Sequence, residues 1–248
     1  MKQTILTVTN QTRIADGVYK MTLSGDCAEI KRPGQFVNFA LDGLFLRRPI
    51  SVCDSSGDSV TVIYKTVGAG TEKMAQMTAG DRLDTLVGLG NGFDTSKSGD
   101  RPLLVGGGCG LPPLYKLCKD LLREGKRPVV IGGFNSKKDA FLEDEFNSLG
   151  VEYRISTVDG SLGKRGFVTD VLPETGSYTF FYSCGPIVMM KNLSALCPTS
   201  GEVSLEARMG CGFGACMGCT CETVSGGKRI CKDGPVFQKE EVLWQNFQ

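Results

Sequence analysis

Histidine is absent from this sequence of 248 residues. Its absence excludes mechanisms that need an imidazole base, such as Ser-His or Cys-His nucleophile pairs, together with Rieske centres and histidine-ligated metals. No segment approaches the run of about 18 apolar residues that a transmembrane helix needs, so we expect no membrane span. The chain also lacks an excess of charge of either sign, because it has 28 Lys and Arg residues and 27 Asp and Glu residues. This balance argues against binding nucleic acid or a membrane surface through bulk charge.

Cysteine and glycine, in contrast, are abundant, with 11 and 33 residues. Residues 1–10 alternate between polar and apolar types and lack the apolar core of a signal peptide, which favours a cytoplasmic protein. Disulfides are rare in that compartment, so clustered cysteines there indicate metal ligands. The many glycines predict tight turns and close approaches of the backbone.

The first part of the chain has the pattern of an antiparallel β-barrel or sandwich, which we delimit as a domain over residues 1–98. Short runs of β-branched and aromatic residues are separated by turn sequences such as Asp16-Gly17 and Pro33-Gly34, as expected for several short strands. One short helix is predicted near Thr71–Met77. The predicted strands cover residues 5–8, 18–21, 36–39, 47–51 and 60–64.

Beyond a polar linker from Asn91 to Pro102, strands and helices alternate, which predicts a parallel sheet with crossover helices over residues 99–200. From residue 201 to 248 we expect a small Cys/Gly-rich module. The predicted strands of the sheet cover residues 103–105, 129–131, 153–155 and 179–182, and helices are predicted over 114–122, over 138–149 and after Pro186.

The strongest motif is Cys211-x4-Cys216-x2-Cys219, which is followed by Cys221 and Cys231. This spacing is that of plant-type [2Fe–2S] sites, in which one loop wraps around the cluster. The alternative is a structural zinc site, although zinc ribbons usually carry two C-x2-C pairs. Cys221 and Cys231 both remain candidates for the fourth ligand. Cys231 is favoured because a distant segment closes the far side of the cluster more easily.

The same loop has no charged side chain between Met209 and Cys221. Met209, Phe213 and Met217 are apolar in a segment that we expect near the surface. Exposed apolar patches commonly mark contacts with a partner protein. Shielding of the cluster from water explains the same residues equally well.

Two motifs in the first domain suit phosphate groups. Arg47-Arg48-Pro49-Ile50-Ser51 offers guanidinium forks and a hydroxyl to a pyrophosphate, although paired arginines are often only a solvated surface. Gly68-Ala69-Gly70-Thr71 precedes the predicted helix, and a glycine-flanked helix N-terminus suits an anion.

Two motifs in the second domain suit a nucleotide. Residues 106–113, Gly-Gly-Gly-Cys-Gly-Leu-Pro-Pro, follow an apolar strand and open a helix, where glycines permit close approach to a phosphate. Pro113 stands where the full dinucleotide fingerprint has its third glycine. Residues 182–186, Tyr-Ser-Cys-Gly-Pro, end a later strand of the same sheet, where ligands of open α/β sheets gather. Taken alone, Cys184 is better explained as a small buried residue.

In this order, the motifs resemble the ferredoxin–NADP reductase superfamily. The tail resembles the electron-transfer subunits of class 1B dihydroorotate dehydrogenases. The strings that carry this likeness are Gly210-Cys-Gly-Phe-Gly-Ala-Cys-Met-Gly-Cys219, Cys231-Lys-Asp-Gly-Pro-Val-Phe237 and the Arg-Arg-Pro-Ile-Ser motif.

The resemblance implies a β-barrel domain that binds FAD, an α/β domain that binds NAD+ and a [2Fe–2S] module. It implies that electrons pass from an FMN-containing dihydroorotate dehydrogenase catalytic subunit, through the cluster and FAD, to NAD+, in a heterotetramer of two plus two subunits that serves pyrimidine biosynthesis. Its implied FAD contacts are Arg48, Pro49, Ile50, Ser51, Ile63, Tyr64, Lys65, Gly70 and Thr71. Its implied cluster ligands are Cys211, Cys216, Cys219 and Cys231. The candidate NAD contacts are Gly106, Gly108, Gly110, Cys184 and Gly185.

Two other functions stay open at this point. A related iron–sulfur flavoprotein, such as a ferredoxin–NAD(P) reductase or the small subunit of a sulfide dehydrogenase or transhydrogenase, would share fold and cofactors but not the partner. A module with a structural four-cysteine zinc site would have no turnover. No acidic residue follows the strand over 129–131 to mark a ribose hydroxyl, so NAD is chosen over NADP on the resemblance alone.

Overall fold

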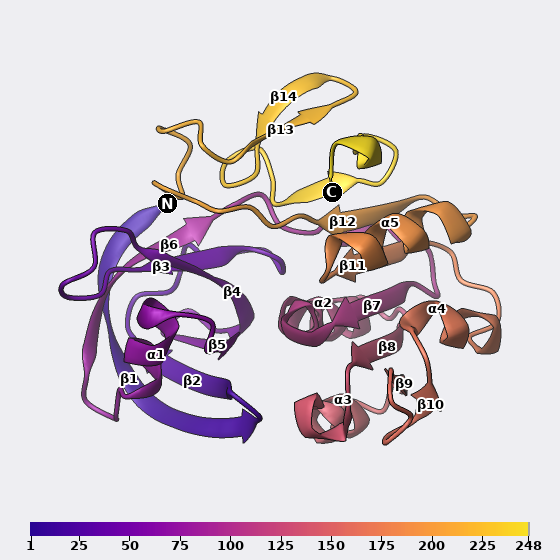
Figure 1. Ribbon diagram of the computed structural model, residues 1–248, viewed down its shortest axis with the longest axis horizontal. Helices are drawn as coiled ribbons and strands as arrows, with labels where there is room; N and C mark the ends of the chain where they lie inside the picture. Colours follow the sequence, from indigo (N-terminus) through magenta and orange to yellow (C-terminus); the bar gives the residue numbers. More distant parts are fainter. Residues whose placement is uncertain (248) are drawn as a thin grey trace.

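A computed structural model of the protein describes residues 1–247. Figure 1 shows three parts: a barrel of N-terminal strands on the left, a sheet with helices on the right, and a C-terminal segment across the top of both. In this described part of the chain, no helix combines the length and the apolar character needed to cross a bilayer.

Six antiparallel strands close the barrel in the order β1-β2-β5-β4-β3-β6. In β6 every second side chain is buried, because one face of the strand lines the core and the other faces outward. Leu6, Met21, Val62 and Leu83 are among the core residues. The predicted antiparallel barrel is confirmed. Its strands are β1 (Lys2–Ala15), β2 (Val18–Ser24), β3 (Phe36–Phe39), β4 (Arg48–Ser55), β5 (Ser59–Lys65) and β6 (Arg82–Leu89).

The second sheet has seven strands in the order β10-β9-β8-β7-β11-β12-β15. All neighbours run parallel except β15, which pairs antiparallel with β12. Every residue of β7 is buried, as expected for a central parallel strand. The predicted parallel sheet is confirmed. Its strands are β7 (Leu103–Gly107), β8 (Val129–Phe134), β9 (Glu152–Thr157), β10 (Lys164–Arg165), β11 (Phe181–Cys184), β12 (Gly201–Ser204) and β15 (Val236–Gln238).

The longest helix, α2 (Pro112–Arg123), joins the two domains. Its buried side chains Leu114, Leu117 and Cys118 share one core with Ile63 of the barrel and Val130 of the sheet. The barrel and the sheet are therefore packed together rather than tethered. The remaining helices are α1 (Ala69–Ala75), α3 (Glu143–Ser148), α4 (Val168–Val171) and α5 (Ile187–Leu196).

The helix predicted over residues 138–149 is wrong in its first half. Lys137–Asp139 forms a single 3₁₀ turn, and Leu142 then adopts a left-handed conformation with φ of 67°. This conformation interrupts a right-handed helix, so α3 starts only after it. The predicted strand over 179–182 lies instead at Phe181–Cys184, and the one predicted from residue 47 begins at Arg48.

The C-terminal segment is anchored in the second sheet. Its strands β12 and β15 extend that sheet, with Val203 opposite Phe237 and both side chains buried. Between them, β13 (Thr220–Thr223) and β14 (Gly226–Arg229) form a separate hairpin. The domain boundary expected at residue 200 thus falls where the chain enters a strand of the nucleotide-domain sheet.

Candidate cofactor sites

The loop from Cys211 to Cys219 is shaped around sulfur atoms. The Cys211 Sγ accepts hydrogen bonds from the backbone N–H groups of Phe213, Ala215 and Cys216, at 3.5, 3.2 and 3.4 Å. Burial alone would raise the pKa of the Cys211 thiol, but hydrogen bonds from the backbone and from Cys216 lower it to about 6. The loop therefore favours the thiolate, which is the form that binds metal.

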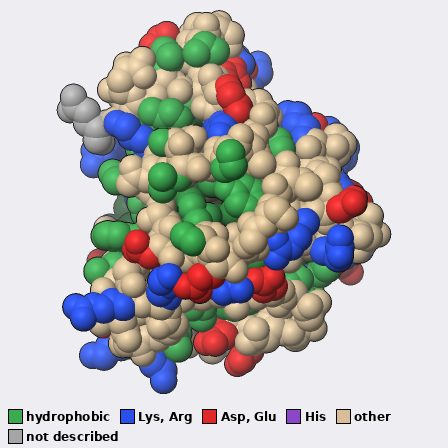
Figure 2. Space-filling view, turned by 90° about the vertical axis from the view of Figure 1, so that its right-hand side faces the viewer, with side chains coloured by type: hydrophobic (Ala, Val, Ile, Leu, Met, Phe, Trp, Pro, Cys, Tyr) green, Lys and Arg blue, Asp and Glu red, His purple; other side chains and the backbone are tan. Residues whose placement is uncertain are grey.

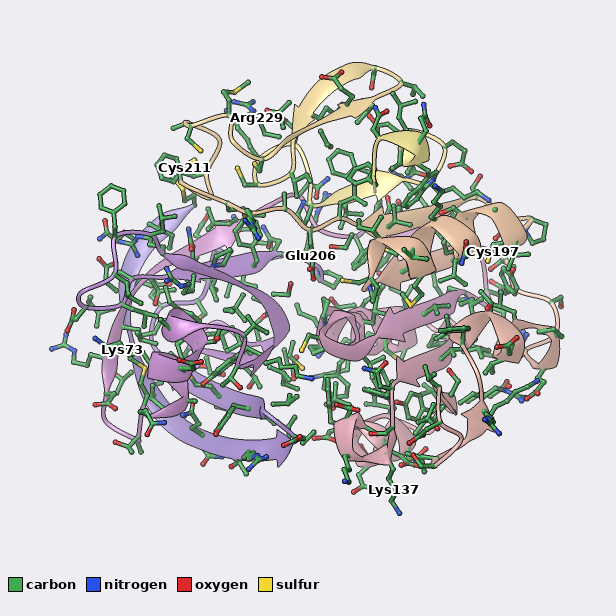
Figure 3. The ribbon with its side chains drawn as sticks, viewed as in Figure 1. Lys73, Lys137, Cys197, Glu206, Cys211 and Arg229 are labelled. Atoms are coloured by element: carbon green, nitrogen blue, oxygen red, sulfur yellow. The ribbon has the colours of Figure 1, made fainter. Side chains whose placement is uncertain are left out.

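Two glycines let this loop pack tightly. Gly212 and Gly214 have φ angles of 78° and 92°, which disfavour other residues. A Cβ atom on Gly212 would lie 2.4 Å from Asn38 Nδ2, which donates to the Cys211 carbonyl at 3.2 Å. Across the loop, Arg229 Nη1 donates to the Gly214 carbonyl at 3.0 Å, and Figure 3 shows Arg229 above the loop. The loop is thus fixed by the barrel strand β3 and by the β13–β14 hairpin.

The structure brings Cys231 to Cys219. The backbone N–H of Cys231 donates to Cys219 Sγ at 3.4 Å, and both residues are buried. Cys221, the other candidate for fourth ligand, lies in β13 opposite Lys228. Cys216 lies beside Cys211, and Cys231 lies beside Cys219 and also faces Cys211; a cluster of two irons takes four thiolates. In residues 1–247 no three His, Cys, Asp or Glu side chains lie close enough to hold a single metal ion.

Apolar side chains are exposed next to the cysteine loop. Phe213 and Met217 are 42% and 56% exposed, whereas Met209 packs into the core beneath them. Elsewhere in the described chain, the loop between β3 and β4 carries two more exposed apolar side chains, Phe45 and Leu46. The exposure expected for the apolar residues of the cysteine loop is thus observed for Phe213 and Met217 but not for Met209.

In the barrel, the two adjacent arginines have different surroundings. Arg47 donates to the carbonyls of Asn38 and Asp84 at 3.3 and 2.9 Å, and it pairs with the Asp84 carboxylate at 2.9 Å. Among residues 1–247, Arg48 donates a side-chain hydrogen bond only to the nearby carbonyl of Leu46. Its guanidinium lies over Gly70, where a Cβ atom would come within 2.0 Å of Arg48 Nε. Arg48 is therefore the one positioned, together with the start of α1, for an outside phosphate.

The helix start beside Arg48 is ordered by Thr71. The buried Thr71 hydroxyl donates to the Gly68 carbonyl at 3.0 Å and accepts from the Val67 N–H at 2.8 Å. α1 begins at Ala69, slightly before the predicted start. This turn leaves the N–H groups of the first helical turn free for an anion, as expected for a phosphate site.

The remaining candidate FAD residues at the end of β5 face different ways. Tyr64 points into the barrel, where its hydroxyl donates to Gln11 Oε1 at 2.9 Å. Ile63 packs into the core that joins the two domains. Lys65 is exposed, lines the main cavity and pairs with Asp139 at 3.6 Å. Of these three residues, only Lys65 presents its side chain to the cavity, so Ile63 and Tyr64 offer a ligand mainly their backbone.

A cavity of about 710 Å³ lies between the barrel and the carboxyl ends of the parallel strands. A ligand pocket of an open α/β sheet is expected there. Its apolar wall includes the exposed side chains Phe167 and Val188, and Figure 2 shows a hollow ringed by hydrophobic side chains on one face of the molecule. The cavity is large enough for a sizeable part of a dinucleotide.

The candidate NAD residues divide into two groups at this cavity. Gly108, Gly110 and Gly185 line it. Gly106 and Cys184 do not: a Cβ atom on Gly106 would lie 2.7 Å from the Leu111 Cα, and Cys184 is buried. These two positions serve close packing between strands and helix α2.

No sequence motif marks two of the polar residues that line the cavity. The buried Ser156 hydroxyl, at the end of β9, has no hydrogen-bond partner among residues 1–247. An unpaired buried hydroxyl is costly, and a bound nucleotide would satisfy it. The other is Glu206, just beyond β12. Only the position of Ser156 at the carboxyl end of a parallel strand could have suggested a role for it.

A barrel with a phosphate cradle, a parallel sheet with an apolar cleft and a cysteine loop together define an iron–sulfur flavin reductase of the ferredoxin–NADP reductase fold. The chain is similar to a solved NADH-dependent reduced ferredoxin–NADP oxidoreductase, with 28% identity and a TM-score of 0.89 over 98% of this chain and 91% of that chain. Phthalate dioxygenase reductase, at 18% identity and a TM-score of 0.67 over 84% of this chain and 70% of that one, shares the fold.

Residues 206–243 match the model described as the iron-sulfur cluster binding domain of dihydroorotate dehydrogenase B. Over 98% of its length, the chain is 42% identical to the dihydroorotate dehydrogenase B (NAD(+)) electron transfer subunit of Listeria monocytogenes serotype 4b, covering 99% of that protein. It is 44% identical to the same subunit of Bacillus pumilus, over 98% of each chain. The chain belongs to the family of dihydroorotate dehydrogenase B electron transfer subunits.

Proposed function

We propose that this chain carries electrons from an FMN-containing dihydroorotate dehydrogenase catalytic subunit to NAD+, within a cytoplasmic heterotetramer of two plus two subunits that serves pyrimidine biosynthesis. The observation that supports this most directly is the set of four cysteines, three in a loop fixed by the barrel and by the β13–β14 hairpin and the fourth, Cys231, beside Cys219. A redox group in that loop would lie beside an exposed apolar surface on one side and the two nucleotide domains on the other.

Three cofactors fit the residues present. FAD would be held by its phosphates at Arg48, Ser51 and the start of α1, and by the backbone near Ile63 and Tyr64. A [2Fe–2S] cluster would be held by the four cysteines, with Cys231 rather than Cys221 as fourth ligand. NAD+ would enter the cavity beside Gly108, Gly110 and Gly185. A flavin exchanges single electrons with a cluster and electron pairs with a nicotinamide, so it belongs between the two.

The protein itself would orient and shield these groups. The guanidinium of Arg48 neutralises phosphate charge, the three N–H groups at Cys211 stabilise a thiolate, and the apolar walls of the cavity exclude water from the nicotinamide. None of these tasks needs histidine. We keep residues 1–98, 99–200 and 201–248 as the proposed FAD, NAD and cluster domains, with the strands β12 and β15 shared between the last two.

A related reductase subunit is the second candidate, favoured by the TM-score of 0.89 to the NADH-dependent ferredoxin–NADP oxidoreductase. The partner protein distinguishes the two functions. Anaerobic copurification from the native source is expected to recover an FMN protein that oxidises dihydroorotate. Recovery of a different flavoprotein, with no dihydroorotate oxidation, would replace the first function by the second.

Spectroscopy of the purified chain tests the cofactors. We expect flavin and [2Fe–2S] absorption, acid-labile sulfide, and bleaching of the flavin by NADH in preference to NADPH. Cys231→Ser should lose the cluster while Cys221→Ser, the matched control, keeps it. The opposite pattern would make Cys221 the ligand. A colourless protein that contains zinc would refute electron transfer altogether.

A further inference from the structure

The outer face of β3 lies beneath the cysteine loop. Val37 and Phe39 belong to the barrel core, so the alternation of side chains along a strand turns Phe36 and Asn38 outward. Phe36 packs in the core that contains the candidate ligand Cys219, and Figure 3 labels the first cysteine of the loop above the barrel. One strand of the barrel therefore contacts the candidate cluster site through both of its outward side chains.

Asn38 is a polar residue in a buried place. It is 1% exposed, its Nδ2 donates to the Cys211 carbonyl at 3.2 Å, and its Oδ1 has no hydrogen-bond partner among residues 1–247. A carbonyl oxygen only accepts hydrogen bonds, so the amide must turn its NH2 group toward the loop. Burying an amide with one atom unpaired is unfavourable, and an apolar side chain would avoid that cost. Such a local conflict is expected where a residue serves function rather than stability.

The hydrogen bond from Asn38 fixes the peptide unit between Cys211 and Gly212. Gly212 has a φ of 78°, and a Cβ atom on it would lie 2.4 Å from Asn38 Nδ2. Cys211 Sγ stands on one side of this peptide unit, and on the other side the chain turns so that three backbone N–H groups donate to that sulfur. Among residues 1–247, Asn38 is the one barrel side chain that donates a hydrogen bond to the loop over 211–219. It therefore holds the turn that surrounds the sulfur.

The same strand borders the proposed flavin site. Asn38 is paired with Pro49 of β4, within the motif that would hold FAD, and Arg47 donates to the Asn38 carbonyl at 3.3 Å. Asn38 thus has its backbone on the flavin strand and its amide on the cysteine loop. Hydrogen-bond donors around the sulfurs raise the reduction potential of an iron–sulfur cluster, because they stabilise the negative charge that the added electron brings.

We infer that Asn38 is a positioning residue that raises the reduction potential of the [2Fe–2S] cluster proposed for this loop. The positive end of its NH2 dipole, together with the three N–H groups that it helps to orient, favours the state that holds one more electron. Reduction adds one electron from the donor, and no bond forms or breaks. A higher potential lets this site accept an electron from the partner more readily. This inference rests on the proposed function, because it needs the cluster.

The test measures the potential itself, in the protein loaded with FAD and cluster. Anaerobic redox titration with dithionite, followed by electron paramagnetic resonance, gives this value for each variant. Asn38→Leu keeps a side chain of similar size and removes the donor. We expect its equilibrium constant for one-electron reduction to fall about tenfold, which is about 59 mV, with a changed resonance spectrum. Asn38→His carries a ring N–H at the same branch of the side chain and should restore this constant to within about twofold.

Gln35→Met is the matched control. Gln35 is another buried amide of the barrel, but it bonds the N–H groups of Lys31 and Arg32 and the carbonyl of Gly90 rather than the cysteine loop. This variant should lower the unfolding temperature and leave the potential unchanged. An equal fall of the potential in Gln35→Met and Asn38→Leu would make the effect a general loosening of the barrel and overturn the inference.

The remaining outcomes separate the inference from the proposed function. An unchanged potential in Asn38→Leu overturns the role of Asn38 and leaves electron transfer intact. Equal falls in Asn38→Leu and Asn38→His assign the effect to packing and overturn the inference as well. If Asn38→Leu holds no cluster, Asn38→Ser replaces it, because the shorter hydroxyl stays further from the carbonyl, and an unchanged potential there is decisive against the inference. An unmodified protein without a cluster overturns both proposals.

Discussion

At the scale of single residues, Arg47 and Arg48 show how neighbours in the sequence separate in function. The Arg47 guanidinium is occupied by the barrel, through Asn38 and Asp84. The Arg48 guanidinium lies over Gly70 at the start of α1. The first therefore stabilises the fold, whereas the second is available to a ligand. Substitutions of the two residues should have separable effects.

Arg48→Ala should weaken FAD binding without unfolding the protein. Loss of one charge-assisted contact to phosphate costs about 1.5–3 kcal/mol, which is about 10- to 150-fold in the dissociation constant. Flavin fluorescence during titration of the FAD-free protein measures this constant, and thermal unfolding of the same FAD-free protein should be unchanged. Retention of full FAD affinity would refute the phosphate role of Arg48.

Arg47→Ala should instead lower stability in a pH-dependent way. Burial alone would raise the pKa of Asp84, but hydrogen bonds from Arg47 and Gln3 and the charge of Arg47 lower it. A carboxyl whose pKa is lowered on folding stabilises the protein above its unfolded pKa of about 4, and this contribution is lost as the pH falls through the lower folded value. Because the pair is partly exposed, we expect a loss of about 1 kcal/mol at pH 7. Urea unfolding should show the difference at pH 7 and lose it as the pH falls through the lowered pKa of Asp84.

The sequence could not distinguish these two arginines. The motif Arg-Arg-Pro-Ile-Ser predicted a phosphate site, and only the family resemblance selected Arg48. The partner of Arg47 is Asp84 on β6, which is 37 residues away in the sequence. Contacts of this kind follow from the closure of the barrel, which no local pattern encodes. The cysteine motif could be recognised because three of its four candidate ligands lie within one loop.

At the scale of elements, the place of the C-terminal strands in the fold could not be predicted from local sequence patterns either. The Cys/Gly-rich composition after residue 200 predicted a separate module, yet β12 and β15 belong to the parallel sheet. These strands are only Gly201–Ser204 and Val236–Gln238, which is too short for a clear period. Leu142 likewise interrupts the helix predicted over residues 138–149, through a left-handed conformation that its residue type disfavours, so that α3 starts after it.

The buried Glu202 joins these strands to the interdomain linker. Its carboxylate accepts hydrogen bonds from the Asp94 N–H at 2.9 Å, from Lys97 Nζ at 2.8 Å and from Gln238 Nε2 at 2.8 Å. Glu202→Ala would leave these donors without a partner, which costs about 2–3 kcal/mol. We expect the unfolding midpoint to fall by about 5–10 °C. The exposed Glu240→Ala is the matched control, and equal midpoints for the two variants would show that this junction contributes no stability.

At the scale of the whole molecule, the cysteine loop places the candidate cluster ligands close to the protein surface. It is held by β3 through Asn38 and by the β13–β14 hairpin through Arg229, and the segment that contains the loop and the hairpin runs between β12 and β15 of the sheet. Two side chains of the loop, Phe213 and Met217, are apolar and exposed. Exposed apolar side chains suit docking of a partner protein, and they suit shielding of the cluster from water equally well.

Phe213→Glu tests this surface. A buried charge at an interface, together with loss of an aromatic anchor, should weaken binding to the catalytic subunit by about 2 kcal/mol, or about 30-fold. The cluster absorption spectrum should not change, because the Cys211 sulfur is held by backbone N–H groups rather than by the Phe213 ring. Leu196→Glu alters an equally apolar, exposed residue at the end of α5, far from the loop, and should bind normally. Normal binding by Phe213→Glu, with faster loss of the cluster in air, would instead assign these side chains to shielding the cluster from water.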